Sequence, residues 1–167
     1  QLIAGEINDI KKSLRKGVTT GAFPPIILFT SYLSDEDINR LHATGDCFVS
    51  GERAAAWNIP AFDALAFNKV VLCNGWGGQT QFLRPEEDTG VDLFDYRMVP
   101  VEGMTLCPYH NMYTCYEKWA DPFVDDIMYS MRLAYEGHYK VTDARQKILE
   151  EYSLKIAGQK IREVLSI

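Results

Sequence analysis

Three short, continuously apolar runs separated by helix-like segments constrain the fold more than any other feature of the sequence. The runs are "PPIILFT" (24–30), "DCFVS" (46–50) and "KVVLCN" (69–74). Because they do not alternate between apolar and polar residues, they are typical of strands buried on both faces. A strand–helix–strand–helix–strand order predicts right-handed crossovers and a parallel sheet with helices on both faces. We therefore expect an α/β fold with a Rossmann-like parallel sheet.

Helix-end signals place the other expected elements. Ser34, followed by an acid three residues later, is typical of a helix N-terminus, and Gly45 is typical of a C-terminal cap. Pro60 suits the first turn of a helix that covers "PAFDALAF". The expected helices cover residues 4–16, 34–44, 60–67, 80–83, 122–136 and 142–165. A further short strand is expected over 96–101, and a long ordered loop over 104–116.

The size and charge of the chain exclude several classes of protein. Its 167 residues suit one domain, and 47% hydrophobic with 24% charged residues is an ordinary globular balance. A net charge of -6 offers no basic field to attract nucleic acid. No apolar run is long enough to cross a bilayer. We therefore expect a cytoplasmic protein with no transmembrane segment and no nucleic-acid partner.

The four cysteines are scattered and give no clear metal site. Cys47 and Cys73 lie in expected buried strands, where cysteine behaves as a small hydrophobic residue. Cys107 and Cys115 could form a disulfide, or bind a metal together with His110, but the spacing matches no usual zinc pattern. The sequence favours a reduced protein without a metal.

Two loops are candidates for a binding site because of the strands that precede them. In open parallel sheets, ligands bind at the carboxyl ends of the strands, near helix N-termini. The Ser50–Ile59 loop and the Gly75–Thr80 turn each follow an expected strand, so we expect both at the same edge of the sheet. Free backbone N–H groups there could hold a phosphate or the hydroxyl groups of a sugar.

Asp63 and Trp57 each have two interpretations from residue type alone. We expect Asp63 in the first turn of the Pro60 helix, where a carboxylate interacts favourably with the helix dipole. The alternative is that Asp63 accepts hydrogen bonds from ribose hydroxyls. Trp57 could pack in the core or stack on a ligand. Residue type by itself favours the dipole for Asp63 and packing for Trp57.

An ordered series of segments is similar to a known family. "LSDEDINRLHATGDCFVS" is followed by "AWNIPAFDALAFNKVVLCNGWGG", and then by "KWADPFVDDIMYSMRLAYEG" and "EYSLKIAGQKIREVL". In this order the segments resemble the C-terminal, donor-nucleotide domain of group 1 glycosyltransferases, which have the GT-B fold. The resemblance covers the chain from about Pro24 to its end.

This resemblance implies a function and a set of site residues. It implies binding of a nucleotide-diphosphate sugar and transfer of a hexosyl or related group to an acceptor hydroxyl, with retention of configuration. No cofactor and no metal are implied. Asp63 matches the family's ribose-binding acid, with Asp in place of the usual Glu, so the ribose interpretation overtakes the dipole interpretation. The implied donor-binding residues are Ala55, Ala56, Trp57, Asn58, Ile59, Asp63, Gly77 and Gly78.

The alanine triplet 54–56 departs from the family pattern. The family's first acid, eight residues before Asp63, falls on Ala55, and a family glycine falls on Asn58. Alanine cannot accept a hydrogen bond or stabilise positive charge at an anomeric carbon. Glu52 could act as a substitute catalytic acid; otherwise activity has been lost, or the side chains were removed by engineering or selection. A catalytically inactive GT-B-like binding or scaffold module is therefore the alternative, and an unrelated doubly wound domain such as a flavodoxin-like receiver is a third.

The length of the chain is the second departure. A GT-B enzyme has two Rossmann-like domains, and the 167 residues contain neither the acceptor domain nor the glycine-rich turn that opens the second domain. We expect a single incomplete domain, truncated at its N-terminal side and inactive by itself. Its expected partners are the nucleotide-sugar donor and the missing N-terminal domain or a partner chain. Missing strands also predict exposed apolar surface and self-association.

Overall fold

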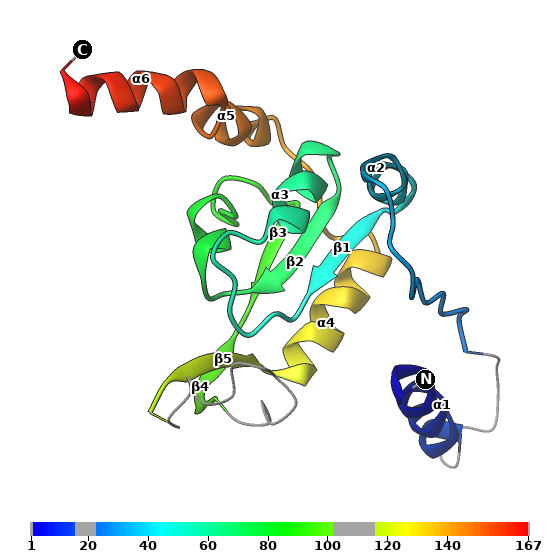
Figure 1. Ribbon diagram of the computed structural model, residues 1–167. Helices are drawn as coiled ribbons and strands as arrows, with labels where there is room; N and C mark the ends of the chain where they lie inside the picture. The colour runs from blue at the N-terminus through cyan, green and yellow to red at the C-terminus, as the bar shows by residue number, and fades with distance from the viewer. Residues whose placement is uncertain (1, 16–22, 102–115, 167) are drawn as a thin grey trace. The chain divides into compact units, whose positions relative to one another are not determined.

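The computed structural model describes residues 2–15, 23–101 and 116–166 (Figure 1). The chain divides into two compact units, residues 1–37 and 38–167, and each is described by itself. Among the described residues, no helix is long and apolar enough to cross a membrane.

The first unit contains α1 (Leu2–Arg15) and the start of α2 (Asp35–Thr44), two helices that the sequence predicts. Ser34 caps α2, because its Oγ accepts a hydrogen bond from the Asp37 backbone N–H at 3.2 Å. The expected long loop over 104–116 lies outside the described residues except for its last residue.

The strand expected over 26–30 is wrong. That segment has no regular secondary structure, and its apolar side chains are exposed, with Ile27 at 75%. A continuous apolar run indicates burial, but a strand also needs a neighbour that satisfies its backbone hydrogen bonds. The run does not specify that neighbour, and Pro24 and Pro25 remove two backbone donors.

The second unit contains a three-stranded parallel sheet in the order β1-β2-β3. β1 (Cys47–Ser50) and β2 (Val70–Asn74) pair in parallel, which confirms the prediction for both strands. β3 (Val91–Phe94) pairs in parallel with the other edge of β2 and was not predicted. Its short "VDLF" sequence has a charge inside it, so it does not look like a buried strand.

Helices cover both faces of this sheet, as predicted. α3 (Ile59–Ala66) packs Ala61, Ala64 and Leu65 into a core that contains Val71 and Cys73 of β2. Residues that alternate along a strand point to opposite faces, so Leu72 and Asp92 face the other side.

That other side is covered by α4 (Val124–Tyr135). Ser130 of α4 donates a hydrogen bond to Asp92 Oδ2 at 2.6 Å, and the Tyr139 hydroxyl donates to the same oxygen at 2.5 Å. The protein is therefore an α/β protein with a Rossmann-like parallel sheet.

A second, two-stranded sheet lies beyond the carboxyl ends of β1 and β2 (Figure 1). β4 (Tyr96–Pro100) confirms the strand expected over 96–101, and it pairs antiparallel with β5 (Lys118–Pro122). β5 was not predicted. The backbone N–H of Ala120 donates to the Arg53 carbonyl at 2.9 Å, so the β4–β5 pair is attached to the loop that follows β1.

The C-terminal part contains two helices where one was expected over 142–165. α5 (Ala144–Glu151) and α6 (Leu154–Leu165) are separated at Ser153. The Ser153 hydroxyl accepts a hydrogen bond from the Ile156 N–H at 3.4 Å, which caps a new helix instead of extending the old one. The short helix expected over 80–83 is a 3₁₀ turn, η1 (Gly78–Gln81).

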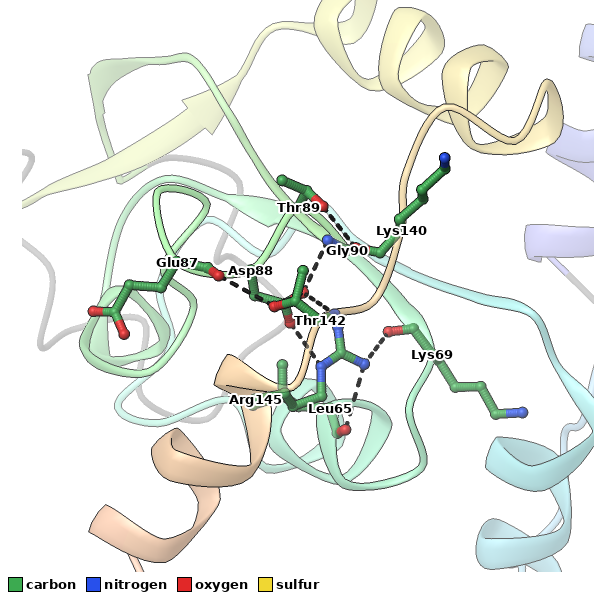
Figure 2. Close-up of polar contacts among 9 residues, drawn as sticks. All are labelled: Leu65, Lys69, Glu87, Asp88, Thr89, Gly90, Lys140, Thr142 and Arg145. Carbon is green, nitrogen blue, oxygen red and sulfur yellow. Dashed lines mark hydrogen bonds and ion pairs between the residues drawn. The ribbon is translucent and has the colours of Figure 1, made fainter.

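A buried ion pair joins α5 to the rest of the second unit (Figure 2). Arg145 Nε donates to Asp88 Oδ2 at 2.7 Å, and both side chains are almost completely buried. Asp88 Oδ1 accepts from the backbone N–H groups of Gly90 at 2.9 Å and Thr142 at 3.1 Å. We call Asp88, Thr142 and Arg145 the buried junction.

The buried junction also fixes the C-terminal end of α3. Arg145 Nη1 donates to the carbonyl of Lys69 at 2.7 Å and to the carbonyl of Leu65 at 3.5 Å (Figure 2). The Leu65 carbonyl also accepts from the Asn68 N–H at 3.0 Å, so the guanidinium adds a further contact at this end of the helix. The helix whose other end begins at the candidate site is therefore held in place through α5.

Candidate functional site

The two loops singled out from the sequence lie directly against each other. The Gly78 N–H donates to the Ala55 carbonyl at 2.9 Å. A Cβ atom on Gly77 would lie 2.7 Å from the Ala55 oxygen, and one on Gly78 would overlap the Ala56 carbonyl. Glycine is required on this turn because the opposing backbone approaches so closely.

The alanine triplet contributes its backbone to this contact. Ala54 and Ala56 are exposed and Ala55 is half-buried. Carbonyl groups of Ala55 and Ala56 face the glycine pair, whereas the fold makes no evident demand on the methyl groups of Ala54 and Ala56. The arrangement therefore explains the glycines opposite the triplet and does not itself explain the alanines.

Asn58 sets the start of α3. Its φ of 61° lies in the left-handed region, which asparagine adopts more readily than most residues other than glycine. Its Oδ1 accepts a hydrogen bond from the Ala61 N–H at 3.3 Å, so it is the N-cap and Ile59 is the first helical residue. Ile59 itself is exposed.

This N-cap corrects the expected position of Asp63. Because α3 begins at Ile59, Asp63 is its fifth residue, and the first turn contains no acid. A helix dipole acts mainly within the first turn, so this position weakens the dipole interpretation. Asp63 is half-buried, and its carboxylate forms no hydrogen bond or ion pair with any residue in the described part of the chain.

Trp57 packs against other aromatic side chains. Its ring centroid lies 4.9 Å from those of Phe82 and Tyr152 and 5.9 Å from that of Phe62. Such tilted and edge-on contacts stabilise a core. The indole is therefore engaged by packing, and it connects the loop after β1 to the C-terminal segment.

Two buried amides hold the loops and the β4–β5 pair together. Asn74 Nδ2 donates to the Glu52 carbonyl at 2.9 Å and to the Ala120 carbonyl at 2.8 Å. Gln79 Nε2 donates to the Asn74 carbonyl at 3.1 Å and to the Trp76 carbonyl at 2.5 Å. Both side chains are fully buried. The sequence places them at a strand end and after the glycine pair, but it does not indicate what they bind.

Glu52, the candidate substitute acid, is held only through its backbone. Its carbonyl is fixed by Asn74, whereas its side chain is exposed and forms no hydrogen bond with another described residue. The carboxylate therefore has freedom to move relative to the loop.

Two arginines from different segments converge on one aspartate at the same edge of the sheet. Arg53 Nε donates to Asp121 Oδ1 at 2.8 Å, and Arg97 Nη2 donates to Asp121 Oδ2 at 3.2 Å. The Arg53 guanidinium also lies over the Trp119 ring, 4.8 Å from its centroid. We call the cavity of about 260 Å³ at this place the arginine pocket; its lining residues are Arg53, Arg97, Val99, Pro100, Trp119 and Asp121.

The two arginines stabilise the ionised form of Asp121. Partial burial acts to raise the pKa of this carboxyl group, but the hydrogen bonds and charges of Arg97 and Arg53 outweigh it, so the pKa lies below its ordinary value. The pocket thus contains two cations and one anion. No sequence signal marks this pocket, because Arg53, Arg97 and Asp121 are far apart in the chain and follow no motif.

Of the two cysteines that the structure describes, Cys73 is buried and Cys47 is half-buried, and both have weakly acidic thiols. Burial, with the charge of Asp46, raises the pKa of Cys47 to about 11. Burial, with the charges of Glu52 and Cys47, raises the pKa of Cys73 to about 12. Cys107, Cys115 and His110 lie outside the described residues, and within those residues no group of three or more His, Cys, Asp or Glu side chains is placed to hold a metal ion.

The chain matches no protein-family model, no curated protein and no solved structure at a significant level. The fold and the geometry of the site are therefore the basis for a functional proposal.

Proposed function

We propose that this chain binds a nucleotide-diphosphate sugar and serves as the donor-nucleotide part of a retaining sugar transferase. The observation that carries the proposal is the contact of the Ser50–Ile59 loop with the Gly77–Gly78 turn at the carboxyl edge of a parallel sheet. This edge is where open α/β sheets bind ligands. The sequence resemblance supplies the chemical identity of the ligand.

Asp63 supports the proposal as the ribose acceptor. The half-buried Asp63 carboxylate has no hydrogen-bond partner among the described residues, so its oxygens are available to accept hydrogen bonds from two ribose hydroxyls. Its position just beyond the first turn of α3 weakens the competing dipole explanation.

The test is the affinity of the chain for nucleoside diphosphates with and without the Asp63 charge. Hydrogen bonds to a charged acceptor contribute about 1.5–3 kcal/mol each. Asp63→Asn should therefore weaken binding of UDP, GDP or ADP at least about tenfold in calorimetry. Asp143→Asn, which changes an exposed aspartate at the start of α5, is the matched control. Equal affinities for the two variants would show that Asp63 does not hold the ribose.

A non-catalytic binding or scaffold module is the second candidate, and Ala55 is the observation that favours it. The position at which the resemblance implies a sugar-binding acid has a methyl group, and the side chain of Glu52 is not fixed nearby. Ala55→Glu should leave nucleoside diphosphate affinity nearly unchanged and raise affinity for, or turnover of, the nucleotide sugar. If Ala55→Glu produces no sugar-dependent effect, the binding-module function is the better description.

A further inference from the structure

The arginine pocket has more positive charge and more hydrogen-bond donors than its aspartate uses. Arg53 donates to Asp121 through Nε, and Arg97 donates through Nη2. Among the described residues, the two terminal nitrogens of Arg53 and the Nε and Nη1 of Arg97 have no partner. Each guanidinium therefore retains a set of N–H groups that is free to bind a further anion.

The surroundings of the pocket hold these donors in place. Asp121 contacts both guanidinium groups, and the Trp119 ring supports Arg53 from one side. Val99 and Pro100 supply apolar walls, and the cavity of about 260 Å³ is large enough for a phosphate or diphosphate group. The Arg53 side chain is 49% exposed and that of Arg97 is 66% exposed, so a ligand can reach both from solvent.

The position of the pocket is consistent with a ligand-binding role. Arg53 directly precedes the alanine triplet, and the Arg53 carbonyl is hydrogen-bonded to Ala120 of β5. The β4–β5 pair lies beyond the carboxyl ends of β1 and β2 (Figure 1). The lining residues of the pocket come from this pair and from the loop after β1, so the pocket belongs to the carboxyl edge of the parallel sheet.

We propose that the arginine pocket is an anion site that binds the phosphate or diphosphate group of a ligand. Arg53 and Arg97 contact the phosphate oxygens with the N–H groups that Asp121 leaves free, in the forked geometry that suits phosphate. Asp121 holds the arginines but also competes with the ligand, because its negative charge repels the phosphate. If the phosphate belongs to the nucleotide-sugar donor, the pocket extends the proposed function; if it belongs to another ligand, the site is independent of that function.

The first experiment measures binding of inorganic pyrophosphate to the full chain by calorimetry. Arg97→Ala and Arg53→Ala should each weaken binding at least fivefold, and Arg97→Lys, which keeps the charge without the fork, should give an intermediate loss. Arg132→Ala, which removes an exposed arginine of α4, is the control and should bind as the unaltered chain does. Absence of pyrophosphate binding to the unaltered chain, or equal affinities for Arg97→Ala and Arg132→Ala, would overturn the proposal.

The second experiment separates a binding role from a structural role. Asp121→Asn removes the competing charge while retaining an oxygen that can accept from the arginines. We expect pyrophosphate to bind at least threefold more tightly to this variant, whereas damage to a purely structural ion pair would not increase affinity. Unchanged or weaker binding would contradict the competition between Asp121 and the ligand.

A third experiment identifies the source of the phosphate and keeps the two proposals distinguishable. UDP, GDP and ADP are each tested for displacement of pyrophosphate, with uridine, guanosine and adenosine as phosphate-free controls. Displacement by a diphosphate but not by its nucleoside supports the donor as the source; no displacement supports a separate phosphate ligand. Asp63→Asn should weaken nucleotide binding and leave pyrophosphate binding unchanged, so failure of the ribose assignment leaves the anion site standing.

Discussion

The Arg145–Asp88 and Arg53–Asp121 pairs have almost the same bond geometry and opposite surroundings. Their Nε–Oδ distances are 2.7 and 2.8 Å. In the first pair both side chains are at most 1% exposed, whereas in the second they are 49% and 20% exposed. The same two residue types can therefore serve structure in one place and ligand binding in another.

The two ion pairs differ in how many of their charged atoms have hydrogen-bond partners. Asp88 has both oxygens occupied by Arg145, Gly90 and Thr142. Arg145 also binds two backbone carbonyls, so that among the described residues only its Nη2 lacks a hydrogen-bond partner. Asp121 has two arginines around it, and each of them keeps donors that have no partner within the described residues. In a buried pair nearly every polar atom needs a hydrogen-bond partner, because an unpaired buried charge is costly. The donors of an exposed group can instead bind water or a ligand.

The largest expected effect comes from breaking the buried pair. Arg145→Met should lower the free energy of unfolding by about 3–5 kcal/mol, because Asp88 is left buried without its counter-charge. Urea denaturation followed by circular dichroism measures the loss. Arg84→Met, which removes an arginine from the exposed pair with Glu151, is the control and should cost much less. Similar losses for the two variants would mean that burial does not distinguish these ion pairs.

A smaller effect is expected from crowding the buried junction without changing a charge. A Cβ atom on Gly90 would lie 2.9 Å from Arg145 Nη2 and 2.9 Å from Val141 Cα, so the backbone or the guanidinium has to move. Gly90→Ala should cost about 1–3 kcal/mol in the same denaturation assay. Gly51→Ala, whose Cβ would meet its nearest neighbour at an ordinary 3.4 Å, is the matched control. A Gly90→Ala variant as stable as Gly51→Ala would show that the buried junction is loosely packed.

The pH dependence of stability should show the ionisation of the buried Cys73 thiol, whose pKa is raised mainly by burial. Burial raises the pKa of Cys73 to about 12 from an ordinary value of 9.0. The unfolded chain therefore releases this proton first as the pH rises, so the stabilisation is complete below pH 9.0 and is lost as the pH passes through about 12. Urea midpoints should fall between pH 8 and pH 10.5, and the fall should be smaller in Cys73→Ala. An equal fall in both proteins would assign the pH dependence to other groups.

The smallest expected effect on stability concerns the arginine pocket. Arg97→Ala should leave the urea midpoint unchanged within error, because an exposed ion pair contributes little to folding. The same variant is expected to lose pyrophosphate affinity, so stability and binding separate at this site. A marked loss of stability would show that Arg97 acts as Arg145 does, and the comparison between the two pairs would fail.

The parts of the fold that were predictable are those with local signals. β1 and β2 are continuous apolar runs, and α3 has a proline in its first turn, where proline is favoured. β3 was missed because Asp92 interrupts its apolar run, and the partners of that charge, Ser130 and Tyr139, come from a later segment. The 26–30 strand was wrong because hydrophobicity cannot specify a pairing partner.

In the candidate site too, features set by nearby residues were predictable, whereas contacts between segments far apart in the chain were not. The meeting of the Ser50–Ile59 loop with the glycine turn followed from the parallel order of β1 and β2. The place of Asp63 in the helix was wrong by one position, which puts it just beyond the first turn, because the helix start depends on the positive φ of Asn58, which the sequence pattern did not reveal. The arginine pocket was not predictable, since Arg53 and Asp121 are 68 positions apart and belong to no motif.

The buried junction has a consequence for how the chain folds during synthesis. Asp88 is made 57 residues before Arg145. At a rate of roughly 5–20 residues per second, this gap lasts about 3–11 s. During that interval the Asp88 carboxylate lacks the counter-charge that it has in the folded protein, and burying it would cost free energy. We therefore expect the corner between β2 and β3 to reach its final packing only after α5 has been made, although most strands of the second unit were made long before.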